Sequence, residues 1–105
     1  MKLQQLRFIL AIAECDLNIT QASQHLYTSQ PGVSKQLRLL EDELGIEIFA
    51  RNGKNLIGVT EKGKFILEKA AEIMKVVNEI KAYSNSLNLD KRPLPLHEFT
   101  EFAHA

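Results

Sequence analysis

The sequence predicts a mainly α-helical protein that carries one small β-hairpin and ends in a long helix. Apolar residues recur at steps of three and four over residues 3–13, 33–44 and 66–87, as they do on the buried face of a helix. An Asn-Gly pair at 52–53 stands between two short apolar segments, which is typical of a hairpin turn. The 105 residues, 45% of them hydrophobic and 25% charged, suit one folded domain.

The first two helices are expected before residue 27. Residues 1–14 form an amphipathic helix whose apolar face is Leu3, Leu6, Ile9, Leu10 and Ala13. Residues 16–18 interrupt this helix, and Thr20 is expected to cap a short second one. Ala22 and Leu26 lie on one face of the second helix, where the small Ala22 allows another helix to cross closely.

The third helix is expected between two clear end signals. Ser29 is a favourable N-cap, Pro31 suits the first turn, and Gly45 is a typical helix stop. Its buried stripe is Val33, Leu37, Leu40 and Leu44. A short helix, a tight turn and a longer helix make the layout of a helix-turn-helix, which we place at about residues 19–38.

A small hairpin is expected after Gly45. The apolar residues Ile46 and Ile48 precede the Asn52-Gly53 pair, and both residues of that pair accept positive φ angles. Leu56, Ile57 and Val59 follow the pair, and the basic residues Arg51 and Lys54 flank its tip. A helix-turn-helix followed by such a hairpin is a winged helix, which we expect over residues 1–60.

A long fourth helix is expected over residues 61–89. Thr60 caps it, and Gly63 is expected to weaken its first turn slightly. One face repeats at alternating steps of four and three, like the seam of a coiled coil: Ile66, Ala70, Ile73, Val77, Ile80, Ser84 and Leu87. A second stripe, Leu67, Ala71 and Met74, runs beside it. Both stripes can serve one intramolecular core, but the chain offers little else to cover them, so we expect a dimer. Residues 90–105 are rich in helix breakers and are expected to form a tail.

Charge is unevenly placed along the chain. The net charge is zero, with 13 Lys and Arg against 13 Asp and Glu, which taken alone argues against nucleic-acid binding. Residues 18–39 and residues 49–60, however, each carry two cations and no acid, while four acids lie between these segments. A basic face can therefore coexist with zero net charge, although ordinary solvated surface gives the same pattern.

The third helix carries a polar and basic face opposite its buried stripe. This face consists of Pro31, Ser34, Lys35 and Arg38, with Gln30 at the exposed N-terminal end. In a DNA major groove Gln pairs with adenine, and Lys or Arg pairs with guanine. Ser hydroxyls and free N–H groups at a helix N-terminus suit phosphate oxygens. Joined to a helix-turn-helix and a basic hairpin, this face predicts sequence-specific binding to double-stranded DNA.

We expect no enzymatic activity, no cofactor and no metal site. Cys15 is the single cysteine and cannot form an internal disulfide, which fits a reducing cytoplasm. It also has no second Cys or nearby His for nucleophilic or redox chemistry, and His25 is expected in packing or on the surface. The stretch His97-Glu98-Phe99-Thr100-Glu101 is one residue short of the zinc motif His-Glu-x-x-His, because Glu101 replaces the second histidine. His97, Glu101 and His104 can share one helix face, but the tail that carries them offers no cavity for a metal. No apolar run approaches the ~20 residues needed to span a membrane, so we expect a cytoplasmic protein.

Two stretches of the sequence, LYTSQPGVSKQL at 26–37 and LEDELGIEIFAR at 40–51, resemble the N-terminal domain of LysR-type transcriptional regulators. Together with RNGK at 51–54 and the opening MKLQQLR, they are similar to the CysB branch, which governs sulfur assimilation and cysteine biosynthesis genes in bacteria. The resemblance covers about residues 1–89. It implies a winged helix-turn-helix and a linker helix that pairs with another subunit.

The resemblance also implies which residues contact DNA. In the turn and third helix they are Thr28, Ser29, Gln30, Pro31, Ser34, Lys35 and Arg38, and in the wing they are Arg51, Asn52 and Lys54. Regulators of this family bind pseudo-palindromic sites as dimers within tetramers. Their C-terminal effector domain is expected to be absent, because nothing after Asp90 resembles its first strand, so no effector site is expected. Glu61-Lys62-Gly63 departs from the Pro-Ala-Gly that often begins the linker helix.

We therefore expect a dimeric, sequence-specific DNA-binding regulator of sulfur and cysteine metabolism genes. The alternative is an interaction protein that pairs through the seam at 66–87 with a full-length relative and blocks its activity.

Overall fold

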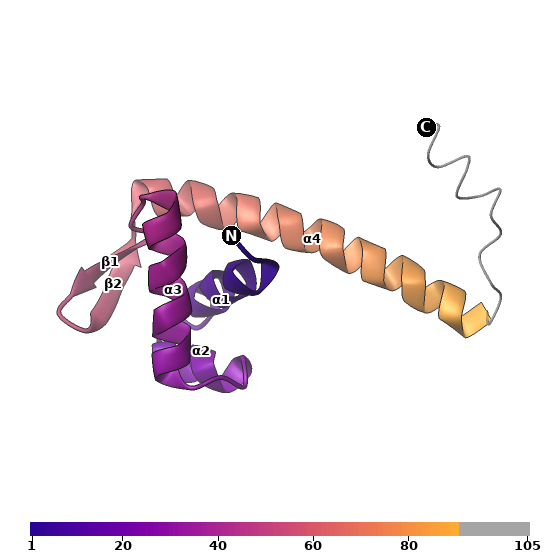
Figure 1. Ribbon diagram of the computed structural model, residues 1–105, viewed down its shortest axis with the longest axis horizontal. Helices are drawn as coiled ribbons and strands as arrows, with labels where there is room; N and C mark the ends of the chain where they lie inside the picture. Colours follow the sequence, from indigo (N-terminus) through magenta and orange to yellow (C-terminus); the bar gives the residue numbers. More distant parts are fainter. Residues whose placement is uncertain (91–105) are drawn as a thin grey trace. The chain divides into compact units, whose positions relative to one another are not determined.

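The computed structural model describes residues 1–90, with side chains to residue 86, and confirms the predicted fold class (Figure 1). The elements are α1 (Leu3–Glu14), α2 (Ile19–His25), α3 (Gln30–Leu44), β1 (Phe49–Asn52), β2 (Asn55–Val59) and α4 (Glu61–Asp90). A first compact unit spans Met1–Met74, and a second begins at Lys75, within α4. The predicted tail lies outside the described residues except for Asp90. No helix in the described part of the chain is long and apolar enough to cross a membrane.

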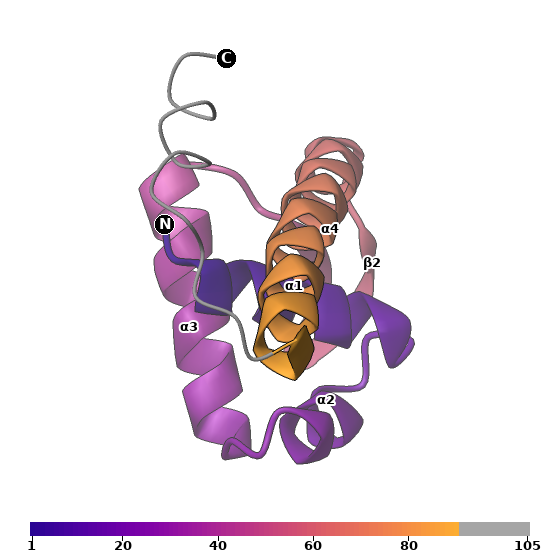
Figure 2. The same cartoon turned by 90° about the vertical axis from the view of Figure 1, so that its right-hand side faces the viewer.

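The core of the first unit forms where α1, α2 and α3 pack on one another (Figure 2). The largest fully buried side chains come from α1, α3 and the start of the hairpin: Ile9, Ile12, Val33, Leu37, Leu40, Ile48 and Phe49. Burial of each such side chain contributes about 1.5–3 kcal/mol, so this cluster supplies the main stabilisation of the fold. Ala22 is fully buried, as its predicted role in close helix crossing requires.

The buried face of α1 differs from the prediction. Leu6 and Ile9 are buried as expected, but Leu3 is exposed, and Phe8 and Ile12 are buried in its place. On a helical wheel the buried arc is rotated toward Phe8. Burying the larger Phe8 and Ile12 removes more apolar surface from water than burying Leu3 and Ala13 would, which explains the rotation.

The start of α2 also differs from the prediction. The N-cap is Asn18 rather than Thr20, because the Asn18 side-chain oxygen accepts the Gln21 N–H at 3.0 Å. Asn is a stronger N-cap than Thr, which agrees with this choice. Asp16 and Leu17 turn the chain sharply before it, with φ angles of 54° and 65°.

Both predicted ends of α3 are confirmed. The Ser29 hydroxyl oxygen accepts the Gly32 N–H at 3.1 Å, and Pro31 lies in the first turn. Gly45 ends the helix in the left-handed conformation, with a φ angle of 67°. The stripe is fully buried from Val33 to Leu40, and Leu44 is partly buried at its end.

The hairpin forms as predicted, but its loop is displaced by one residue. Asn52 pairs with Asn55, so the two-residue loop is Gly53-Lys54 rather than Asn52-Gly53. Gly53, the first loop residue, has a positive φ angle of 64°, whereas Lys54 does not have a positive φ angle. This is the pattern of a type II′ turn. A register shift leaves Ile57 as an extra residue in β2, which increases the local twist.

The hairpin joins α4 through Thr60 and Gly63. The Thr60 hydroxyl accepts the Gly63 N–H at 2.9 Å and donates to the carbonyl of Glu47, so Thr60 caps α4 as predicted. Gly63 is buried against the backbone of Ile48, where an added Cβ would collide with the Ile48 carbonyl group. The expected cost in helix propensity stands, but the missing side chain of Gly63 also lets α4 begin beside the hairpin, a role that the helix pattern did not predict.

The predicted seam of α4 divides between two environments. Ile66 and Leu67 are partly buried against the core, and Ala70 is fully buried in it. Ala70 therefore serves the intramolecular core and is not available to a partner, which corrects its assignment to a dimer interface. Ile66 likewise contributes to the core of its own chain.

From Ile73 onward the predicted seam is exposed at every position whose side chain is described, except Val77. Ile80 is 64% exposed, and two residues outside the predicted seam, Val76 and Tyr83, are 54% and 57% exposed. Val77 is half-buried and less exposed than Val76. The other predicted members are Ser84, which is exposed, and Leu87, whose side chain lies outside the described residues.

The Gly63→Ala variant should test the close contact between α4 and the hairpin. Overpacking against the Ile48 carbonyl should lower the free energy of unfolding by about 1–3 kcal/mol, although Ala gains about 1 kcal/mol of helix propensity. Urea denaturation of the chain measures this difference. Gly58→Ala is the matched control, since nothing lies within 4 Å of an added Cβ there. A Gly63→Ala variant as stable as the control would show that the contact is dispensable.

Candidate nucleic-acid interface

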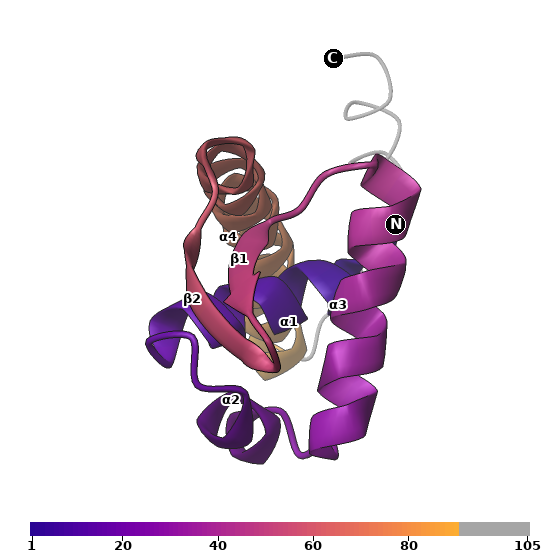
Figure 3. The ribbon, with the colours of Figure 1, turned by 90° about the vertical axis from the view of Figure 1, so that its left-hand side faces the viewer.

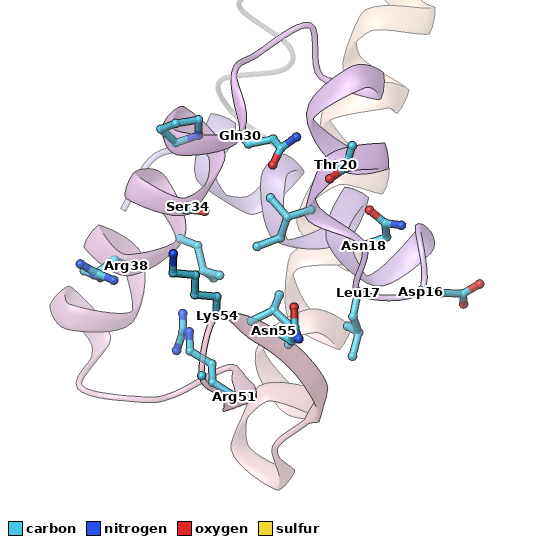
Figure 4. Close-up of a pocket in the computed structure, with 15 residues that line it drawn as sticks. Asp16, Leu17, Asn18, Thr20, Gln30, Ser34, Arg38, Arg51, Lys54 and Asn55 are labelled. Atoms are coloured by element: carbon cyan, nitrogen blue, oxygen red, sulfur yellow. The ribbon is translucent and has the colours of Figure 1, made fainter.

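An open cleft of about 900 Å³ lies between α3 and the hairpin. Figure 3 shows the hairpin beside α3, and Figure 4 shows the residues that line the cleft. The α3 residues on this side are spaced four apart and so share one helix face. The polar and charged lining comprises Gln30, Ser34 and Arg38 of α3, Arg51, Lys54 and Asn55 of the hairpin, and Asn18 and Thr20 at the start of α2.

Three cations line this cleft, and two of them are unpaired. Arg38 and Lys54 are exposed, and Lys54 extends from the hairpin toward α3 (Figure 4). No ion pair of the described residues involves either of these two side chains. Asp16 also lines the cleft, but its carboxylate points away from α3 (Figure 4). The cleft is therefore a basic surface on a chain of zero net charge.

Lys35 lies on a neighbouring face of α3. It is exposed and is absent from the cleft lining, whereas Pro31 and Ser34 belong to that lining. Val33 and Leu37 hold the opposite side of the helix in the core. Packing of this buried side therefore fixes the orientation of α3 and of its exposed face.

The two hydroxyl residues before α3 are already engaged within the chain. The Thr28 hydroxyl donates to the Leu26 carbonyl at 2.9 Å, and the Ser29 oxygen accepts the Gly32 N–H. The Ser29 hydrogen is not used by that cap, so it can donate to a phosphate oxygen. Gly32 leaves room here, because a Cβ would lie 2.9 Å from the Thr28 methyl carbon.

Arg51 is held by a buried acid. Its guanidinium donates to the Glu41 carboxylate at 2.6 Å, and the Glu41 side chain is 8% exposed. In the sequence Glu41 is one of the four acids between two basic segments, and the charge pattern alone does not predict its burial. Its position four residues after Leu37 places it beside the buried stripe, and this spacing is the signal that was available.

Three polar residues that line the cleft were not predicted as site residues from the sequence. Asn18, Thr20 and Asn55 come from a helix start and a hairpin, and they join α3 at the cleft only in the folded chain. Asn52, the remaining predicted wing residue, is exposed in β1 and does not line the cleft.

The residues weighed for other chemistry lie elsewhere. Cys15 is buried in the core, and His25 is exposed on α2. The residues compared with a zinc motif, His97, Glu101 and His104, lie outside the described residues.

Comparison with known proteins places these features in a family. Residues 3–64 match the family model described as bacterial regulatory helix-turn-helix protein, lysR family. The HTH-type transcriptional regulator CysB of Haemophilus influenzae is 51% identical over 85 residues, which cover 81% of this chain and 26% of that protein. The HTH-type transcriptional regulator cbl of Escherichia coli is 44% identical over 90 residues, which cover 86% of this chain and 28% of that protein.

A solved structure shares the fold. The BenM_DBD/catB site 1 DNA complex matches with a TM-score of 0.75 at 28% identity, covering 84% of this chain and 96% of that one. The chain spans about a quarter of the length of the two curated relatives, at 26% and 28%. Because the family model matches more than half of the residues, the chain belongs to the lysR family of bacterial regulatory helix-turn-helix proteins.

Proposed function

We propose that this chain binds double-stranded DNA sequence-specifically as part of a transcriptional regulator. The observation that carries the proposal is a group of exposed cations on α3 and the hairpin, Lys35, Arg38 and Lys54, which form no ion pair within the described residues. Arg38 and Lys54 line an open cleft rather than an enclosed cavity, and Lys35 lies on the neighbouring face of α3, as binding to a polyanion much larger than the cleft requires.

The proposed contacts divide by element. The outer face of α3 enters the major groove, where Gln30, Lys35 and Arg38 pair with base edges and Pro31 and Ser34 pack beside them. Thr28 and Ser29 lie at the N-terminal end of α3, where hydroxyl and N–H groups suit phosphates. The hairpin follows the adjacent minor groove or backbone through Asn52 and Lys54, with Arg51 beside them near its tip.

The regulated genes that we infer are those of sulfur assimilation and cysteine biosynthesis. The identity of 51% to a protein named CysB supports this assignment. Regulation of bacterial genes also implies that the protein acts in the cytoplasm, where the DNA lies.

We propose further that the chain binds DNA as a homodimer through α4. The exposed apolar residues Ile73, Val76, Ile80 and Tyr83 follow steps of three, four and three. This is the a/d spacing of a coiled coil, so a partner helix can cover all four side chains at once. Val77 lies beside this stripe, and by spacing Leu87 is the next position of the same repeat.

The Lys35→Ala and Arg38→Ala variants test the DNA interface. Each should cost about 1–3 kcal/mol of binding free energy if the side chain reads a base. Binding is measured by fluorescence anisotropy on a duplex that the unmodified chain selects from a random-sequence pool. Lys69→Ala is the matched control, because it removes the same charge from α4. Binding unaffected by both α3 changes would contradict the proposal.

The Ile80→Asp variant tests the dimer. A carboxylate placed between paired helices loses its hydration, so sedimentation should show a monomer, and DNA binding should weaken because the second half-site is lost. Ala82→Asp puts the same charge on the opposite side of α4 and should remain dimeric. Sedimentation of Ile80→Asp as a dimer would exclude this interface.

The exposed stripe is also compatible with the corresponding helix of a full-length relative. Co-expression with tagged CysB of Haemophilus influenzae, whose similarity covers 81% of this chain, tests that second partner. Mixed dimers in the purified fraction would favour an antagonist of the relative. Purely homodimeric material would count against this alternative.

A further inference from the structure

Glu41 is a buried carboxylate that connects α3 to the hairpin. Its Oε2 accepts the N–H of Ile48 at 2.7 Å and that of Phe49 at 3.4 Å. Its Oε1 accepts a hydrogen bond from the Arg51 guanidinium at 2.6 Å. The acceptor therefore belongs to α3, while all three donors lie in β1 or at the residue before it.

The backbone of Glu41 holds the segment between these two elements. Its carbonyl oxygen accepts the N–H of Gly45 and, at 3.1 Å, the N–H of Ile46. One residue thus binds the helix end, the connection and the first strand. A rotation of the hairpin relative to α3 would break several of these bonds together.

Glu41 also lies between the two walls of the basic cleft. Arg38, one turn before it, lines the cleft from α3, and Arg51 lines it from β1. Both arginines border a second hollow together with Glu41. The carboxylate that holds the hairpin is therefore adjacent to the cations proposed to face DNA.

We propose that Glu41 is a positioning residue for DNA recognition, which fixes the pose of the hairpin through Arg51 and the β1 amides. Arg51 then acts through Glu41 rather than as a phosphate ligand, and Lys54 is the hairpin cation that contacts DNA. This inference rests on the proposed DNA binding and specifies how the hairpin takes part in it.

The salt dependence of binding separates these two roles. Each phosphate neutralised by a cation contributes about −0.9 to the slope of log K against log salt concentration. The Arg51 charge is already paired with Glu41, so it displaces no counterion from DNA. Losing the Arg51 charge should therefore cost at most the Lys54 contact that the hairpin pose supports, so that losing both charges should change the slope no more than losing the Lys54 charge alone.

The experiment compares Lys54→Gln with the double variant Arg51→Gln/Lys54→Gln on the duplex that the unmodified chain selects from a random-sequence pool. We expect Lys54→Gln to reduce the steepness of the slope by about 0.9. The double variant should show the same slope as Lys54→Gln, and Arg51→Gln alone should abolish the hydroxyl-radical protection of the DNA segment under the hairpin. A reduction of the slope by about 1.8 in the double variant would overturn the proposal, since Arg51 would then be a direct ligand.

A second pair of variants tests Glu41 itself. Glu41→Gln keeps an oxygen for the Ile48 amide but removes the charge that holds Arg51, so protection under the hairpin should be lost while protection by α3 remains. Glu43→Gln removes the same charge from an exposed position of α3 and should keep the whole footprint. Equal footprints for these two variants would overturn the proposal.

Circular dichroism identifies any single variant that does not fold. In that case the comparison is made between Glu41→Gln/Arg51→Gln, which leaves no buried charge unpaired, and the same variant with Lys54→Gln added. Equal slopes with loss of hairpin protection support the proposal, and a further reduction of the slope by about 0.9 on adding Lys54→Gln overturns it. Failure of the unmodified chain to select any duplex would instead contradict the proposed function.

Discussion

The backbone of Ile48 is the point on which three parts of the fold depend. Its N–H donates to Glu41 of α3, and its carbonyl accepts the N–H of Thr60 at 3.0 Å, just before α4. Gly63 packs directly against the same carbonyl group, and the Ile48 side chain is fully buried. Each contact fixes an element that the core alone would leave free to pivot, because hydrophobic packing is not directional. The hairpin beside the cleft is therefore oriented by hydrogen bonds and a close backbone contact.

The electrostatics of the chain follow from the same arrangement. Zero net charge hides a separation in which Glu41 is buried with Arg51, while Lys35, Arg38 and Lys54 remain free of ion pairs in the described residues. Exposed charges separated by more than about 8–10 Å are largely screened at physiological ionic strength. Acids farther from the cleft than this distance therefore do not cancel its local potential. Charge placement, rather than the sum, supports the proposed binding to DNA.

Features that depend on residues close together in the chain were predicted correctly from the sequence, whereas features that depend on distant residues were not. Ser29, Gly45 and Thr60 were correctly predicted as helix ends because a cap involves only residues a few positions apart. The prediction of the buried face of α1 was partly wrong because two apolar stripes overlap on that helix. Only the packing of neighbouring helices decides which stripe is buried. Gly63 and Glu41 were misjudged for the same reason, since each meets a residue at or before the hairpin that no local pattern connects to it. In the site, single helix faces were predictable, whereas the cleft that joins three elements was not.

The environment of α4 shows how one apolar repeat can serve two purposes in succession. A core face and a coiled-coil seam both require apolar residues at steps of three and four, so the repeat alone does not mark where one ends. Burial does mark it, because Ala70 is enclosed while Ile73, one turn later, is at 36% exposure. Beyond this boundary the most exposed apolar residues of the described part of α4 are Ile80 of the predicted seam and, outside it, Val76 and Tyr83. The first unit needs only the beginning of the helix, and the apolar stripe beyond it supports the proposed pairing with a second α4.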